Sequence, residues 1–142
     1  METPQVVVAV IVTNGSALLL GRDAKTGRWT LPKGGVLKFQ ELQTVGRTAV
    51  AETTGIAVEV TGSIFISEDI VPPEHNVVVV ALGKLLGSGD ALKPVARLDV
   101  FSEVRWVDFR ELGDIQHDID SITTDAIMKF GLYMQAKMQE AR

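Results

Sequence analysis

The stretch LPKGGVLKFQELQTVGRTAVAETTGI, residues Leu31–Ile56, joins a glycine-rich turn to a segment with helical periodicity. A helix is predicted from about Glu41 to Thr54, and Gly55 supplies the expected stop. A glycine-rich turn that leads into a helix suggests a phosphate or metal site. One helical face is defined by small or apolar residues at offsets 0, 3, 4, 7, 8 and 11, which are Leu42, Val45, Gly46, Ala49, Val50 and Thr53.

The composition around this stretch is that of a globular protein. The chain has 142 residues, of which 46% are hydrophobic and 23% are charged, so a single domain over residues 1–142 with a sizeable core is expected. A net charge of −4 argues against nonspecific nucleic-acid binding, which would need a basic stripe. The absence of cysteine excludes disulfides, thiol catalysis and zinc–thiolate sites.

The N-terminal run METPQVVVAVIV lacks a basic region, and its apolar part is too short to span a membrane. A buried strand explains this run better. We therefore expect a cytoplasmic protein with no membrane partner.

The order of the expected elements predicts a mixed α/β fold. A turn is expected at Asn14-Gly15, and Pro32 ends a short extended piece that starts at Trp29. Ser121 is predicted to cap a final helix that runs to about Gln139. Because a helix follows each group of strands, we expect one helix against each side of a sheet. Strands are predicted over residues 5–13, 17–21, 57–66, 76–86 and 104–109.

The segment Leu31–Ile56 resembles the signature of the Nudix hydrolases. Their box reads Gly, five residues, Glu, seven residues, then Arg-Glu-aliphatic-any-Glu-Glu-any-Gly-aliphatic, and this spacing fits from Gly34 onward without a gap. The strand pair before the box and the sequence 104–112 are also similar to the family. Residues of the expected type are Gly34, Val50, Glu52, Gly55 and Ile56, and residues of another type are Gln40, Thr48, Ala49 and Thr53.

This resemblance implies a Nudix-like α/β/α sandwich, with a mixed sheet between the box helix and the C-terminal helix. It also implies cleavage of a nucleoside diphosphate linked to another group, with Mg²⁺ or Mn²⁺ as the cofactor. In the family, metal-binding carboxylates stand at positions matching Ala49, Glu52 and Thr53, on one edge of a helical turn. Here only Glu52 is a carboxylate, so Gly34 and Glu52 are the candidate metal-site residues and Glu52 is a candidate catalytic residue.

The family's Arg and earlier Glu, which normally pair to hold a metal-binding Glu, are replaced here by Thr48 and Gln40. Losing both partners leaves no stranded charge. Glu41 is an alternative ligand, but a helical neighbour points about 100° away. Glu41 is otherwise explained as a first-turn carboxylate that interacts favourably with the helix dipole, which needs no function.

Other acids offer alternative catalytic groups. In this family a base is sometimes supplied from a late loop, and Glu103 or Asp99 could take that role. Each is otherwise an ordinary loop acid. His75 is a weaker alternative as a metal ligand, because a polar loop residue beside Pro72-Pro73 explains it as well.

Candidate ligand-binding residues surround the loop that enters the box. Arg22, Arg28 and Lys33 form a basic trio that could meet phosphates, and each is otherwise a solvated loop cation. Lys33 in Leu-Pro-Lys-Gly occurs in family branches that handle dinucleoside polyphosphates and related compounds. Trp29 forms either a wall for the base of a nucleotide or part of the hydrophobic core.

Two functions are therefore predicted. The first is a Nudix-type hydrolase of nucleoside diphosphate-linked compounds. Its activity should be weak, because removing one electrostatic stabiliser commonly lowers a rate by about a hundred- to a thousandfold. The alternative is an inactive Nudix-fold module that binds a nucleotide or acts in regulation. A scaffold or homodimer built on the methionine-rich last helix is a third interpretation.

Overall fold

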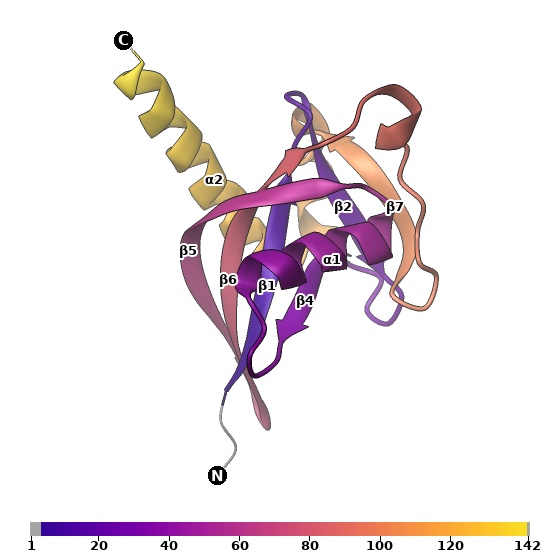
Figure 1. The fold of residues 1–142 in the computed structure, drawn as a ribbon, viewed down its shortest axis with the longest axis vertical. Coiled ribbons are helices and arrows are strands. Elements are labelled where there is room, and N and C mark those ends of the chain that lie inside the picture. Colours follow the sequence, from indigo (N-terminus) through magenta and orange to yellow (C-terminus); the bar gives the residue numbers. More distant parts are fainter. Residues whose placement is uncertain (1–3, 142) are drawn as a thin grey trace.

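The computed structural model describes residues 4–141, which form seven strands, two α-helices and three short 3₁₀ helices (Figure 1). The 3₁₀ helices are η1 (Gly89–Leu92), η2 (Phe109–Glu111) and η3 (Gln116–Asp118). The other elements are β1 (Gln5–Val12), β2 (Ala17–Asp23), β3 (Trp29–Thr30), β4 (Lys33–Val36), α1 (Leu42–Thr54), β5 (Val58–Val71), β6 (Glu74–Leu85), β7 (Phe101–Asp108) and α2 (Ser121–Glu140).

The strands form two sheets where the sequence predicts one. The larger sheet has the order β4-β1-β6-β5, and the smaller has the order β3-β2-β7. Strands β1 and β6 run parallel while the other pairs are antiparallel, so the larger sheet is mixed. The division comes at Asn14 and Gly15, where the turn leads β2 away from β1 to pair with β3 and β7 instead.

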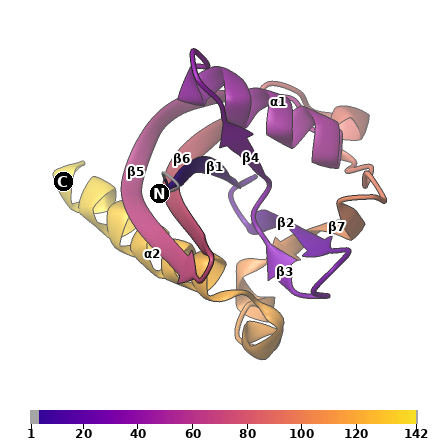
Figure 2. The ribbon, with the colours of Figure 1, turned by 90° about the horizontal axis from the view of Figure 1, so that it is seen from below.

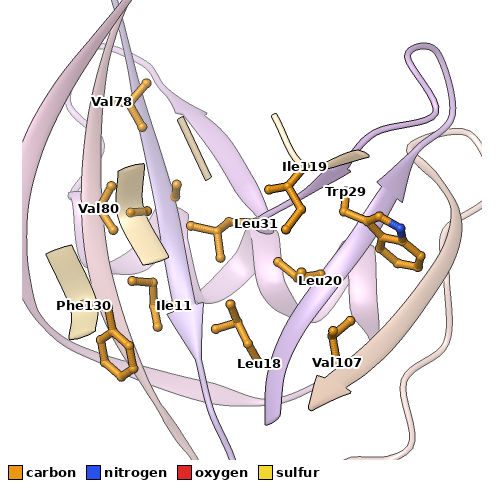
Figure 3. Packing of buried hydrophobic residues seen from close by; sticks show 12 residues of the cluster. Ile11, Leu18, Leu20, Trp29, Leu31, Val78, Val80, Val107, Ile119 and Phe130 are labelled. Atoms are coloured by element: carbon orange, nitrogen blue, oxygen red, sulfur yellow. The ribbon is translucent and has the colours of Figure 1, made fainter. Parts of the chain in front are cut away.

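Strand β1 divides the core into two clusters, because its side chains alternate between the two faces of the larger sheet. Val8, Val10 and Val12 pack with Val50 of α1. Ile11 packs on the opposite face in the cluster that contains Phe130 of α2 (Figure 3). Accordingly, α1 lies in front of the strands and α2 behind them in Figure 1, and Figure 2 shows the two helices on opposite sides. The predicted α/β/α layering is confirmed.

The hairpin of β5 and β6 is longer than predicted. Its strands pair from Val58↔Leu85 to Val71↔Glu74, so the prediction of strand ends at residues 66 and 76 is wrong. The extra residues of β5 are Ser-Glu-Asp-Ile-Val, which have no apolar/polar alternation to indicate a strand, and the hairpin tip extends beyond the rest of the sheet (Figure 1). Strand β7 also starts earlier than predicted, at Phe101, whose buried ring packs against Gly21.

The two helix termini test the capping predictions. Gly55 ends α1 as predicted, with a φ of 74° and an N–H donated to the Ala51 carbonyl at 3.0 Å. The cap of α2 is Asp120 rather than Ser121, because Asp120 Oδ1 accepts a hydrogen bond from the Thr123 amide at 2.7 Å. Over residues 4–141, no helix is both long and apolar enough to cross a membrane.

Candidate functional site

A cleft of about 490 Å³ lies between the loop after β4 and one side of α1. Gly34, which is at the edge of the larger sheet in register with Val8, forms part of its wall. The structure thus brings together most of the box positions singled out from the sequence. The lining residues are Gly34, Gly35, Phe39, Gln40, Glu41, Thr44, Val45, Thr48, Ala49 and Glu52.

Gly34 permits the close approach of α1 to β4. A Cβ atom added at Gly34 would lie 3.1 Å from the Ala49 Cβ and 3.2 Å from Val45 Cγ1, closer than ordinary van der Waals contact. Gly35, by contrast, has no atom within 4 Å of such a Cβ. A side chain at position 34 would therefore require Ala49 and Val45 to shift by a few tenths of an ångström.

The two metal-ligand positions of the helix that lack carboxylates are buried. Ala49 is 8% exposed and Thr53 is 7% exposed. The Thr53 hydroxyl donates to the Ala49 carbonyl at 2.6 Å, a bond within the helix. Thr53 consequently uses its hydroxyl to satisfy the helix backbone.

Glu52 remains accessible, with 61% of its side chain exposed, but it faces a cation. Its Oε2 lies 3.8 Å from Nη1 of Arg97, and Nε of Arg97 lies 2.9 Å from Oδ1 of Asp99. Asp99, an alternative base from the sequence, thus shares a guanidinium with Glu52. Sequence reasoning missed Arg97, because a single arginine in a polar loop carries no local signal of its partner.

The loop that carries Arg97 is fastened to the last turn of α1. The amides of Val95 and Arg97 donate to the carbonyls of Thr54 and Thr53, at 2.8 and 3.2 Å. These bonds satisfy carbonyls that a helix end otherwise leaves without an intrahelical partner. Trp106 Nε1 also donates to the Leu92 carbonyl at 2.7 Å, which ties the same loop to β7.

The described side chains do not fit the divalent cation that the Nudix resemblance implies. Hard divalent cations prefer several oxygen ligands, usually including more than one carboxylate. Of the three helix positions, only Glu52 offers a carboxylate, and it faces Arg97. Within residues 4–141, no three or more His, Asp or Glu side chains are grouped so that they could hold a metal ion.

The predicted basic and aromatic ligand-binding residues lie outside the lining of this cleft. Trp29 is 4% exposed and belongs to the core cluster, so the structure favours the core interpretation. The guanidinium carbons of Arg22 and Arg105 lie 5.7 and 5.1 Å from the centre of its ring. Arg22 is in register with both Trp29 and Glu103, which places Glu103 in the smaller sheet.

The other candidates, except Glu41, are also away from the cleft lining. Lys33 is exposed on β4, where it pairs in register with Ala9 of β1, and Arg28 is exposed beside β3. His75 Nε2 lies 2.8 Å from Oε2 of Glu68 in the β5–β6 hairpin. Glu41 does line the cleft, where it precedes the first residue of α1 without a capping bond from its side chain.

Both the sequence and the fold are similar to those of known proteins. A family model described as NUDIX domain matches residues 3–126 of the chain. A search of the curated proteins found no match.

Solved structures with the same fold include three instructive cases. A NUDIX hydrolase from Nitrosomonas europaea superposes with a TM-score of 0.78 at 15% identity, covering 92% of this chain and 90% of that one. A MutT NUDIX hydrolase from Burkholderia pseudomallei gives 0.77 at 22% identity, with coverages of 90% and 98%. The NUDIX domain of Shewanella oneidensis NrtR, in complex with ADP ribose, gives 0.75 at 13% identity, with coverages of 94% and 90%.

Proposed function

The chain belongs to the Nudix family, and from this premise we propose that it binds a nucleotide or nucleotide-linked compound in the cleft beside α1 without hydrolysing it at an appreciable rate. The proposal separates two properties of Nudix enzymes, the binding cleft and the metal-dependent cleavage. Nudix hydrolases generally use a divalent cation for the second property.

The observation that carries the proposal is the state of the three helix positions. Ala49 and Thr53 are buried, and the Thr53 hydroxyl is bonded to the helix backbone. Glu52 is the remaining carboxylate and is opposite Arg97. Because enzymes usually gain most of their rate enhancement by stabilising the charge that develops in the transition state, losing this donor set removes most of that enhancement.

The cleft itself supports ligand binding. Its volume of about 490 Å³ lies within the range of roughly 300–1,000 Å³ typical of small-molecule sites. Thr44, Thr48 and Gln40 supply hydroxyl and amide groups on its surface. These neutral groups can donate hydrogen bonds to phosphate oxygens without a bound cation.

Isothermal titration calorimetry and a hydrolysis assay, run on the same nucleotide panel, test this proposal. The panel includes ADP-ribose, nucleoside diphosphates and sugar nucleotides, each with EDTA and with Mn²⁺. We expect at least one compound to bind equally well in both conditions, with no turnover at high protein concentration. Absence of binding across the panel, or clear turnover with Mn²⁺, contradicts the proposal.

A slow hydrolase is the second candidate, favoured by the accessible carboxylate of Glu52 on the cleft wall. In that case Mn²⁺ is required for release of a nucleoside monophosphate. The two candidates therefore differ in metal dependence and in turnover.

A further inference from the structure

Phe39, in the loop between β4 and α1, combines two unfavourable features. Its side chain is 95% exposed, although an aromatic ring gains free energy when it is buried. Its φ angle is 68°, and Phe39 is the residue other than glycine with positive φ in the described chain, residues 4–141. A bulky residue in the left-handed region is strained, and such residues cluster at ligand-binding sites.

A local turn holds Phe39 in this conformation. The Gln40 amide donates to the Leu37 carbonyl at 3.1 Å, and the Leu37 amide donates to Gln40 Oε1 at 2.9 Å. The side chain and the backbone of Gln40 thus close the same turn from both ends. Gln40, which replaces a glutamate of the family box, therefore has a structural role in presenting the ring.

The ring is presented at the cleft beside α1. Among the described lining residues Phe39 is the aromatic one, and its neighbours in the lining include the polar Gln40, Thr44 and Thr48. The ammonium group of Lys38 lies 5.2 Å from the centre of the Phe39 ring. An aromatic face, an adjacent cation and hydroxyl groups match a planar base linked to phosphates.

We propose that Phe39 is a specificity residue that stacks on the planar base of the bound nucleotide. This inference rests on the proposed function, since it assigns the base of the ligand to one side of the same cleft. A protein partner is a weaker match, because the residues beside Phe39 in the cleft are polar rather than a continuous apolar surface. The proposal also accounts for a strained and exposed aromatic residue that the fold itself does not need.

The test compares ADP-ribose with inorganic pyrophosphate, which has phosphates but no base. We expect Phe39→Ala and Phe39→Gly to raise the Kd for ADP-ribose by about 5- to 100-fold, the range typical of losing one base–aromatic stack. Phe39→Trp retains a stacking face and should bind like the wild type. Leu37→Ala, which shortens another exposed apolar side chain of the same turn, is the matched control and should change Kd by less than about twofold.

Three further measurements separate stacking from a structural role. The affinity for pyrophosphate should be unchanged in the Phe39 variants, and intermolecular nuclear Overhauser effects should connect the Phe39 ring to the adenine protons. The melting temperature of Phe39→Gly should stay the same or rise, because glycine adopts positive φ without strain.

Each remaining outcome overturns the inference. If Phe39→Ala binds ADP-ribose as tightly as the wild type, the stacking role fails while the proposed binding function stands. Equal losses for ADP-ribose and pyrophosphate would show that the ring only shapes the cleft. If the wild type binds no compound of the nucleotide panel, the inference and the proposed function fail together.

Discussion

At the scale of single residues, the contact between Gly34 and Ala49 shows why the helix face of the cleft is closed to larger side chains. The missing Cβ of one residue and the single methyl group of the other allow α1 to lie directly on β4. The close packing of α1 on β4 thus depends on small residues at both positions, which are 15 residues apart in the sequence. The sequence indicates that both positions belong to one box, but it does not reveal that they touch.

Ala49→Glu should lower the free energy of unfolding by about 1–3 kcal/mol, because a longer and charged side chain must enter a buried contact. Urea denaturation measures this change. Thr48→Arg, at the exposed neighbouring position, is the control and should stay within about 0.5 kcal/mol of the wild type. Equal destabilisation by both variants would show that the Gly34–Ala49 contact is not the cause.

Glu52→Gln should leave the Kd of a metal-free nucleotide complex within about threefold. The Glu52 carboxylate is exposed, already faces Arg97, and is the one carboxylate among the three helix positions. Calorimetry in EDTA measures the Kd, with Glu59→Gln on β5 as a charge-matched control. A Mn²⁺-dependent activity that is present in the wild type and lost in Glu52→Gln would instead favour the slow hydrolase.

At the scale of elements, the two helices and the end of α1 were easier to predict than the N-terminal cap of α2. The periodicity of α1 and the stop at Gly55 follow from residue spacing and glycine chemistry, and both are confirmed. At α2, Asp120 and Ser121 are adjacent and both are good capping residues, so local preference cannot choose between them. The choice depends on where η3 ends and how the Asp120 amide bonds to the Trp29 carbonyl, which is a tertiary contact.

Asp120→Ala should destabilise the protein by about 0.5–2 kcal/mol, because it removes the acceptor for the Thr123 amide. Ser121→Ala should have an effect below about 0.5 kcal/mol, since Ser121 is exposed inside the first turn. Chemical denaturation of both variants distinguishes the two positions. The reverse order of effects would contradict the assignment of Asp120 as the cap.

At the scale of the whole molecule, the α/β/α layering could be predicted because strands with buried runs alternate with amphipathic helices. The division into two sheets could not, since it depends on which edges pair after the turn at Asn14-Gly15. For the site, the box spacing correctly grouped Gly34, Gln40, Thr48, Ala49 and Glu52 around one cleft. The pairing of Arg97 with Glu52 could not be predicted, because Arg97 lies in a loop whose sequence has no repeating pattern that indicates its path.

The melting temperature of the ligand-free protein should change by less than about 1 °C between EDTA and millimolar Mn²⁺. A cation stabilises a protein only if it binds the folded state, and the described residues provide no group of three ligands. Differential scanning fluorimetry measures this shift. A rise that saturates with Mn²⁺ and disappears in Glu52→Gln would reveal a cation site at the cleft.

The loop between β6 and β7 has a mechanical consequence for ligand entry. Its amides at Val95 and Arg97 hold the last carbonyls of α1, and its Leu92 carbonyl is held by Trp106 of β7. For this loop to move as an independent unit, its hydrogen bonds to the Thr53 and Thr54 carbonyls and to the Trp106 side chain would have to break. If a nucleotide binds in the cleft as proposed, we expect any opening motion to occur at the opposite end of α1, where the turn carrying Phe39 is held by two hydrogen bonds within itself.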